Sequence, residues 1–336
     1  MGPLTERILH AFDGGAGTDA QILAQFARTT GAAEPGIEAV LGALDQASVA
    51  LPLLRTLSSS GAVSGPLSQS LQVSADLLAD VYRIGVGHTL QIIDDLSHGR
   101  QGAIEPINQV IDALPAAASR SIATLNYDGL LPSQLIGRAD THYDLAQGWG
   151  NRDHLVVDGK SPISAVPLRE FDNMLGPDLI NLHGSIGWLR HQTEGWWRFK
   201  VDELRSLEYW KALRENRTEW IPAVVLTNQQ RKSEIVGLYP FSLAYEAFRK
   251  RLANCERLAI IGYGFRDLYL NQVIASVLSK VRQKPNLLVV TQGHYPSEAD
   301  IRTALRLESA YPLALLSNGV VDAIRTTDWQ SWKSDS

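Results

Sequence analysis

The sequence lacks several features that would point to common classes of protein. Its 336 residues include a single cysteine, Cys255, so the chain can form neither an internal disulfide nor a zinc site with four thiolate ligands. Positive charge is not in excess, since 31 Lys and Arg stand against 36 Asp and Glu and give a net charge of -5. Proteins that bind nucleic acid through its phosphates need clustered Lys and Arg. We therefore expect no direct binding to nucleic acid.

Long apolar runs are missing as well. No stretch approaches the roughly 18 consecutive apolar residues that cross a membrane, and the N-terminal MGPLTERILHAFDGG lacks the apolar run of a signal peptide. We therefore expect a cytoplasmic protein without a membrane partner. Hydrophobic residues make up 45% and charged residues 20% of the chain, as in ordinary globular proteins with a packed core.

The first third of the sequence has helical periodicity, and we expect residues 20–115 to form a helical insertion. Apolar residues recur at i, i+3, i+4 and i+7 within 37–44, and the same spacing returns within 107–114. Pro115 predicts the end of the second of these helices, because proline lacks the N–H and its ring clashes with the preceding turn. The serine- and glycine-rich segment 58–70 predicts a loop.

Beyond Pro115, short apolar runs alternate with helical patterns, and we expect the main part of the fold over residues 116–330. Amphipathic patterns within 241–252 and 270–281 predict helices between the runs. Such alternation predicts an α/β fold, with a Rossmann-like parallel sheet that carries helices on both faces. The tryptophan-rich segment 188–220 is expected to be an insertion or lid. The predicted strands are 121–125, 179–182, 223–226, 258–261 and 287–290.

Distinctive residues follow three of these strands, at the sheet edge where α/β proteins bind ligands. Each group has an ordinary explanation as a turn or a structural histidine. Three such groups at one edge together indicate a ligand site, because unrelated turns would not be expected to gather there. The groups are Asn126-Tyr127-Asp128-Gly129, His183-Gly184-Ser185 and Gly262-Tyr263-Gly264-Phe265-Arg266-Asp267.

These groups also carry a resemblance to a known family. TLNYD at 124–128, INLHGS at 180–185 and IIGYGFRD at 260–267 resemble, in order and separation, the SIR2-like domains of bacterial anti-phage defence proteins. GIEAVLGAL at 36–44 resembles a helix near the start of those domains. The resemblance spans residues 36–295. It implies that residues 1–336 form a single SIR2-like domain and that NAD is hydrolysed to ADP-ribose and nicotinamide in anti-phage defence.

The resemblance also implies roles for individual residues. Asn126 would position the nicotinamide ribose and the attacking water, and His183 would act as general base on that water or on a ribose hydroxyl. Asp128 would hold the nicotinamide carboxamide. Gly262 and Gly264 would lie near the ribose and phosphates, Thr291 would face the adenosine side, and Thr124 and Gly184 of the same motifs would also contact NAD.

The chemistry suits these residue types. Nicotinamide in NAD is a leaving group that already bears positive charge, so the transition state resembles an oxocarbenium ion and needs positioning, water activation and electrostatic support. An imidazole is suited to accept a proton at neutral pH. No metal is required, and none is expected. His142, Asp144, Asp153 and His154 have ligand chemistry, but their spacing matches no metal motif.

One segment departs from the family pattern. SIR2-like domains usually begin with an apolar strand that runs into Gly-Ala-Gly-x-Ser and grips the pyrophosphate. Here Gly15-Ala16-Gly17 is followed by Thr18 and by Asp19, whose carboxylate would repel a phosphate. Two interpretations stay open: Gly15 and Gly17 belong to a degenerate phosphate loop, or they form an unrelated loop and the first strand is missing. Gly264 also stands where serine is more usual.

Three functional hypotheses follow. The first is an NAD hydrolase. A sirtuin-type deacylase ranks below it, because such enzymes generally carry a four-cysteine zinc module. The third is a regulatory module that binds NAD or ADP-ribose without turnover. The departure of Gly15–Gly17 from the family pattern is the reason to retain this hypothesis. Since little sequence follows the last predicted strand, we expect no separate sensor domain. We then expect the activity to be controlled by formation of a homo-oligomer or by a separate partner, such as an Argonaute-like or ATPase protein. Lys232 has the charge to reach a phosphate, but we expect it to be a surface lysine.

Overall fold

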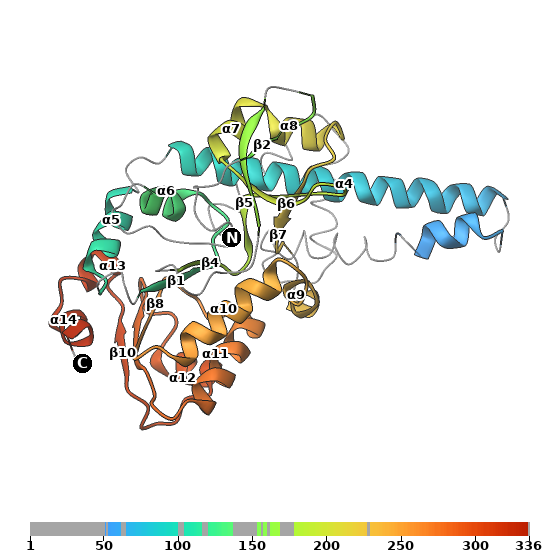
Figure 1. The fold of residues 1–336 in the computed structure, drawn as a ribbon. Coiled ribbons are helices and arrows are strands. Elements are labelled where there is room, and N and C mark those ends of the chain that lie inside the picture. The colour runs from blue at the N-terminus through green and yellow to red at the C-terminus, as the bar shows by residue number, and fades with distance from the viewer. Residues whose placement is uncertain are drawn as a thin grey trace.

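A computed structural model describes most of the chain after residue 50, and its strands form three sheets. A parallel part lies in the lower half of Figure 1 and an antiparallel sheet above it, with the helix α4 crossing the antiparallel part. The described residues are 51, 53–61, 65–99, 104–115, 120–136, 153–155, 157–159, 162–168, 178–226 and 229–334. The segment 36–44 and Gly15, Gly17, His142 and Asp144 lie outside them.

Strands β8, β9 and β10 form a parallel sheet in the order β10-β9-β8. Successive side chains of a strand point to opposite faces, and both faces of β9 are covered. Leu287 and Val289 pack into the core that includes α10 and α11, while Leu288 and Val290 pack against Trp329 of α14. The bounds are β8 (Arg257–Ile261), β9 (Asn286–Val290), β10 (Leu313–Leu316), α10 (Phe241–Ala253), α11 (Leu268–Lys280), α12 (Glu298–Leu305), α13 (Val320–Ala323) and α14 (Thr327–Ser334). The prediction of a parallel sheet with helices on both faces is confirmed.

A second parallel pair, β1 (Ser121–Thr124) and β4 (Asp178–Asn181), lies between this sheet and the antiparallel part. The helices α5 (Ile104–Ala113) and α6 (Leu130–Ile136) cover one of its faces through Ile111, Leu135 and Leu179. Within the described residues, β1 pairs only with β4 and β8 only with β9, so the two parallel sheets are not hydrogen-bonded to each other.

The third sheet is antiparallel, in the order β2-β3-β6-β5-β7, and corrects one prediction. Residues 223–226 were expected to join the parallel sheet, but β7 pairs antiparallel with β5. An apolar run shows that a strand is buried but does not show which neighbour it pairs with. The bounds are β2 (Asp153–Leu155), β3 (Ile163–Pro167), β5 (Gly184–His191), β6 (Gly195–Phe199), α7 (Val201–Ser206), α8 (Tyr209–Arg214) and β7 (Ile221–Val224).

The tryptophans of segment 188–220 belong to this part of the fold. Trp188, Trp210 and Trp220 are buried, and the last two lie in the core that the antiparallel sheet shares with α4, α7 and α8. Large rings placed in this way fill a core. That residues 188–220 are an insertion stays a prediction.

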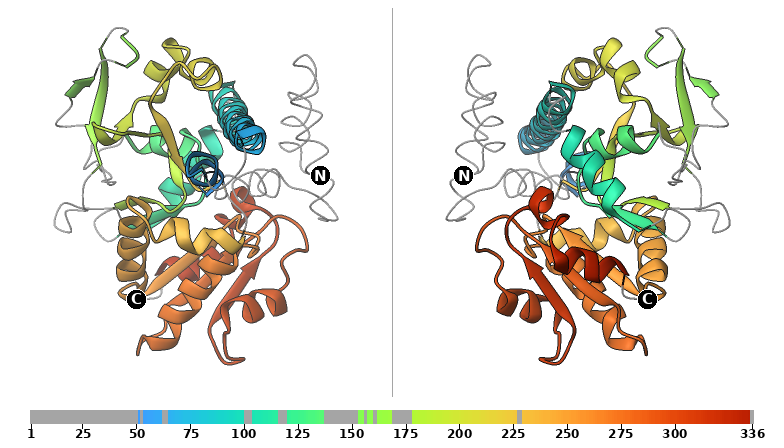
Figure 2. Two further views of the ribbon diagram at one scale, coloured as in Figure 1. Left: turned by 90° about the vertical axis from the view of Figure 1, so that its right-hand side faces the viewer. Right: turned by 90° about the vertical axis from the view of Figure 1, so that its left-hand side faces the viewer.

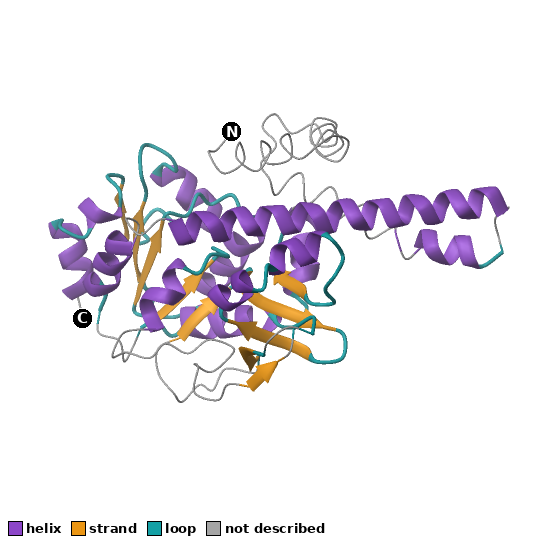
Figure 3. Cartoon of the chain, turned by 90° about the horizontal axis from the view of Figure 1, so that it is seen from above, coloured by secondary structure: helices purple, strands orange, loops and turns teal. Residues whose placement is uncertain are grey.

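The helix α4 (Gly65–Gly99) runs for 35 residues, a length of about 52 Å at 1.5 Å per residue. Its second half packs on the antiparallel part through Val81, Val86 and Leu90, whereas its first half projects away from the body (Figures 1 and 3). The prediction of a loop over 58–70 is wrong at both ends of that range. Residues 58 and 59 belong to a helix over 53–59, and α4 begins at Gly65. Among the described helices, none combines the length and apolarity needed to cross a membrane.

Candidate functional site

Asn126 and His183 follow the ends of two neighbouring parallel strands. Thr124 of β1 is the register partner of Asn181 of β4, and the N–H of Leu182 donates to the carbonyl of Thr124 at 3.0 Å. The pairing thus continues to the ends of both strands. Asn126 lies two residues after Thr124, and His183 lies two residues after Asn181. Neighbouring strands lie about 4.8 Å apart. The two residues therefore follow adjacent strand ends.

Their side chains have different surroundings. Asn126 is exposed, and its side-chain amide makes no hydrogen bond within the described residues; its backbone N–H donates to Oγ1 of Thr124 at 3.1 Å. His183 is only 3% exposed. Its ring stacks on that of Tyr127, with 6.4 Å between centroids, and its carbonyl accepts from the N–H of Val225 at 2.9 Å. The amide can reach a ligand from solvent, whereas the imidazole is enclosed by protein.

A buried cluster of charges surrounds the imidazole. Nε2 of His183 lies 3.2 Å from Oδ2 of Asp267, and Nζ of Lys232 donates to the same oxygen at 2.9 Å. The exposed fractions of these side chains are 4% for His183, 7% for Asp267 and 2% for Lys232. Lys232, on α9 (Gln229–Val236), is therefore not the surface lysine that was expected. It supplies a buried ammonium that balances the carboxylate.

Asp267 also begins a helix, which fixes its carboxylate. It is the N-cap of α11, and Oδ1 accepts the N–H of Leu270 at 3.0 Å. Burial alone would raise the pKa of Asp267, but the contact with His183, the charge of Lys232 and the bond from Leu270 hold that pKa well below its usual value. The hydroxyl of Tyr263 donates to the Asp267 carbonyl at 3.1 Å. The carboxyl group at 267 is therefore ionised and held in one orientation.

Sequence reasoning included Asp267 in the third group but gave it no role, and it placed Lys232 at the surface. Asp267 stands directly before the apolar pattern of α11, where an aspartate is a strong signal for an N-cap. Lys232 gave a weaker signal: it lies one helical turn before Val236, which is 1% exposed, so both residues share the buried face of α9. The polar composition of QQRKSEIV concealed that face.

Asp128 has a local structural role that sequence reasoning also considered. Its Oδ1 accepts the N–H of Leu130 at 3.0 Å, at the start of α6. Burial raises the pKa of Asp128, while the bond from Leu130 works in the opposite direction. Asp128 therefore shapes the turn after β1, and its contact with a nicotinamide carboxamide stays a prediction.

The predicted glycines differ in what surrounds them. Gly184 has φ +81°, and a Cβ built there would lie 2.0 Å from the carbonyl oxygen of Ala223, so the glycine is required by the close approach of β5 and β7. Gly262 has φ +67° with open space around it, and its N–H already donates to the carbonyl of Val290 at 2.9 Å. Gly264 is also uncrowded, since only Cγ of Arg266 would come as near as 4.0 Å. The surroundings of Gly262 and Gly264 leave room for a ligand.

Thr291 follows β9 at the carboxyl edge of the parallel sheet, where Gly262 follows the neighbouring strand β8. Its N–H donates to the carbonyl of Leu316 and its own carbonyl accepts from Gly319, both at 2.8 Å. Its Oγ1 is buried and has no hydrogen-bond partner in the described part of the chain. A buried hydroxyl without a partner is uncommon, which makes Thr291 a candidate for contact with a bound molecule.

Comparison with known proteins bears on these strand ends. A family model described as a SIR2-like domain matches residues 120–312, a range that contains β1, β4, β8 and β9 together with Asn126 and His183. The chain belongs to the SIR2-like domain family. SIR2-like domains bind NAD and are often enzymes, so the activity of this chain is related to NAD at the level of the family. A search of curated proteins gave no match.

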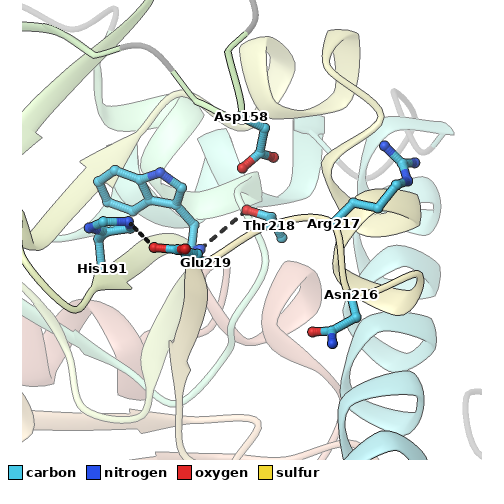
Figure 4. A pocket seen from close by; sticks show the side chains of 7 residues that line it. Asp158, His191, Asn216, Arg217, Thr218 and Glu219 are labelled. Carbon is cyan, nitrogen blue, oxygen red and sulfur yellow. Dashed lines mark hydrogen bonds and ion pairs between the residues drawn. The ribbon is translucent and has the colours of Figure 1, made fainter.

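One hollow in the described part of this SIR2-like chain contains none of the predicted site residues. This hollow of about 590 Å³, shown in Figure 4, lies where β5 meets the segment before β7. There Nε2 of His191 lies 3.1 Å from Oε2 of Glu219, which is 81% exposed.

The described residues contain no group of three His, Cys, Asp or Glu arranged to hold a metal ion. Burial raises the pKa of the Cys255 thiol to about 11.

Proposed function

We propose that this SIR2-like protein is an NAD hydrolase that cleaves the bond between nicotinamide and ribose, with Asn126 and His183 at the reacting centre. The observation that carries the proposal is the register of β1 and β4, which brings an accessible amide and a histidine supported by a buried ion pair to adjacent strand ends. The family membership supports NAD as the substrate.

The reaction follows from the chemistry of these groups. The bond between C1′ of the ribose and the nicotinamide nitrogen breaks, and its electron pair neutralises the positive charge on the ring. The water oxygen then forms a bond to C1′, and its proton passes to His183. Asn126 hydrogen-bonds the ribose and the water, which holds the nucleophile in place for attack. Groups that accept a proton in such steps typically contribute about 10²–10⁴-fold to the rate.

Release of nicotinamide from NAD tests the proposal. We expect the purified protein to release nicotinamide, and Asn126→Ala and His183→Gln to lower the rate by about 10²-fold or more. His191→Gln is the matched control, because it also removes an imidazole beside a carboxylate but lies in the separate hollow of Figure 4. Equal rates for His183→Gln and His191→Gln would refute the assignment of His183.

A module that binds NAD or ADP-ribose without turnover is the second candidate, and one observation favours it. His183 is 3% exposed, so its ring needs a rearrangement before it can meet water or a ribose hydroxyl. Calorimetry with ADP-ribose distinguishes the two functions. Binding of ADP-ribose by a protein that releases no nicotinamide from NAD supports the module.

We further propose, from the resemblance of its three motifs, that the protein acts in anti-phage defence and is switched by self-association or by a partner protein. Exposed apolar side chains on residues 53–59 and on the projecting half of α4 support a role of this region in association. Light scattering after size exclusion, with and without NAD, counts the subunits; a monomer with constant activity would contradict the switch. The exposed fractions are 61% for Leu53, 37% for Leu57, 50% for Leu67, 60% for Val73 and 50% for Leu77.

A further inference from the structure

The buried cluster of Lys232, Asp267 and His183 has a chemical consequence beyond the assignment of His183. Its two charges are removed from water, and buried ion pairs of this kind contribute little net stability, because desolvation offsets their attraction. The pair nevertheless lies against the imidazole that the proposed reaction uses, with Oδ2 of Asp267 shared between Nζ of Lys232 and Nε2 of His183.

The carboxylate of Asp267 is fixed, and Nε2 of His183 lies beside it. Oδ1 of Asp267 accepts the N–H of Leu270 and Oδ2 accepts the Lys232 ammonium, so the group is held from both sides. Nε2 of His183 is buried and makes no well-directed hydrogen bond in the described part, although Oδ2 is only 3.2 Å away. The distance of 3.2 Å is within the range of a hydrogen bond from an Nε2–H to this oxygen.

The charges then determine which nitrogen carries the proton. A lone pair on Nε2 would face the negative oxygen of Asp267, whereas an N–H there is attracted to it, so the Nε2–H tautomer is favoured. A carboxylate alone would also stabilise the doubly protonated ring, which cannot accept another proton. The ammonium of Lys232 on the same oxygen offsets that effect, because it neutralises the carboxylate.

Among the described residues, the other polar groups that contact the cluster are phenols and an amide, while the charged Arg249 lies over the ring of Tyr245. The ring of Tyr127 stacks on His183, and the hydroxyl of Tyr263 is bonded to the Asp267 carbonyl and to Oδ1 of Asn271. Burial raises the pKa of Tyr263 and of Tyr245 well above the usual value for tyrosine, with the Asp267 charge acting in the same direction. Both phenols are therefore neutral at any pH at which the protein is folded and active.

We propose that Lys232 and Asp267 are positioning residues that hold His183 as the neutral Nε2–H tautomer, with Nδ1 as the atom that accepts a proton. The role of Nδ1 in catalysis rests on the proposed NAD hydrolysis, but the protonation state of the ring does not. Lys232 acts through Asp267 and needs no contact with the substrate.

Nitrogen NMR of the histidine rings tests this inference without NAD. We expect His183, assigned by the signal that His183→Gln removes, to show a protonated Nε2 and an unprotonated Nδ1 in the wild-type protein. In Lys232→Met the ring should take up its second proton at a higher pH than in the wild-type protein, because the Asp267 carboxylate is no longer balanced. In the double variant Lys232→Met/Asp267→Asn, which removes both charges, this shift should largely disappear.

Control variants separate this effect from a general loss of structure. Lys200→Met removes the lysine of a more exposed pair with Glu203, 3.4 Å long, and should leave the His183 signal unchanged. Lys232→Arg keeps the charge and should keep the wild-type tautomer. An Nδ1–H tautomer in the wild-type protein, or a ring titration that is the same with and without Lys232, would overturn the inference. The wild-type tautomer alone decides the point if Lys232→Met does not fold.

The pH dependence of nicotinamide release gives a second measurement. The acid limb of the rate profile should move to higher pH in Lys232→Met by the same amount as the NMR titration, and a purely structural ion pair would lower the rate equally at all pH values. A wild-type protein that releases no nicotinamide would refute the proposed function, while the NMR result would still decide the inference about Lys232.

Discussion

Replacing Gly184 by alanine should destabilise the protein severely, for a reason unrelated to NAD. The new Cβ would lie 2.0 Å from the carbonyl oxygen of Ala223 and 3.0 Å from the ring of Phe241. The closest ordinary C···O contacts are about 3.3 Å, so the backbone would have to move by roughly 1 Å. Gly184 is paired with Val224, and the N–H of Val225 donates to the His183 carbonyl, so β7 cannot move away without losing these bonds.

The size of the effect follows from two terms. Forcing extra volume into a packed site costs about 1–3 kcal/mol, and a left-handed backbone at a residue with a Cβ costs about 1–2 kcal/mol. Gly184→Ala should therefore lower the free energy of unfolding by about 2–5 kcal/mol. Gly262→Ala is the matched control, because Gly262 also has positive φ but has nothing within 4 Å of a built Cβ, so only the second term applies.

Urea unfolding followed by tryptophan fluorescence measures both variants. We expect a much lower midpoint for Gly184→Ala and a small decrease for Gly262→Ala. Equal midpoints would refute the steric argument. The two glycines should also differ in function: a methyl group at Gly262 enters open space beside the proposed ribose site, so Gly262→Ala should raise KM for NAD while the protein stays folded.

Three further outcomes are expected. Asp94→Ala should lower the free energy of unfolding by about 3–5 kcal/mol in the same assay, because the buried carboxylate accepts bonds from Arg205 and from an indole N–H of α8; a loss below 1 kcal/mol would contradict it. The pKa of Asp267 is depressed in the folded state, so the stability it contributes is present above the unfolded pKa of about 3.9 and is lost as pH falls below it. Urea midpoints at pH 5 and pH 3 should therefore differ less in the double variant Lys232→Met/Asp267→Asn than in the wild-type protein. Ser297→Ala should cost about 1 kcal/mol, since it removes the capping box of α12, and a stability equal to wild type would show that the exposed cap contributes nothing.

The parallel part of the fold could be predicted because its signals are local. Four buried runs were predicted within a residue or two of β1, β4, β8 and β9, and the helices between them show a clear apolar face. The strand β10 was not predicted, although Leu313–Leu316 is an apolar run of the same length as most of the predicted strands and polar residues follow it at 317–318. The antiparallel sheet was missed because β5 and β6 contain glycine and tryptophan rather than a regular alternation, and pairing is decided by distant partners.

The candidate site shows the same division between local and distant information. Asn126 and His183 could be proposed from the sequence because each directly follows a predicted strand, and the register of β1 and β4 places them after adjacent strand ends. The charge that balances Asp267 could not be found in this way, since Lys232 is 35 residues away from it in a short helix of polar composition. A buried lysine is stable only beside a group that compensates its charge. The burial of Lys232 therefore requires the carboxylate of Asp267, and the burial of Asp267 requires the ammonium of Lys232. The two residues therefore depend on each other, and the role of neither could be assigned from the sequence around it alone.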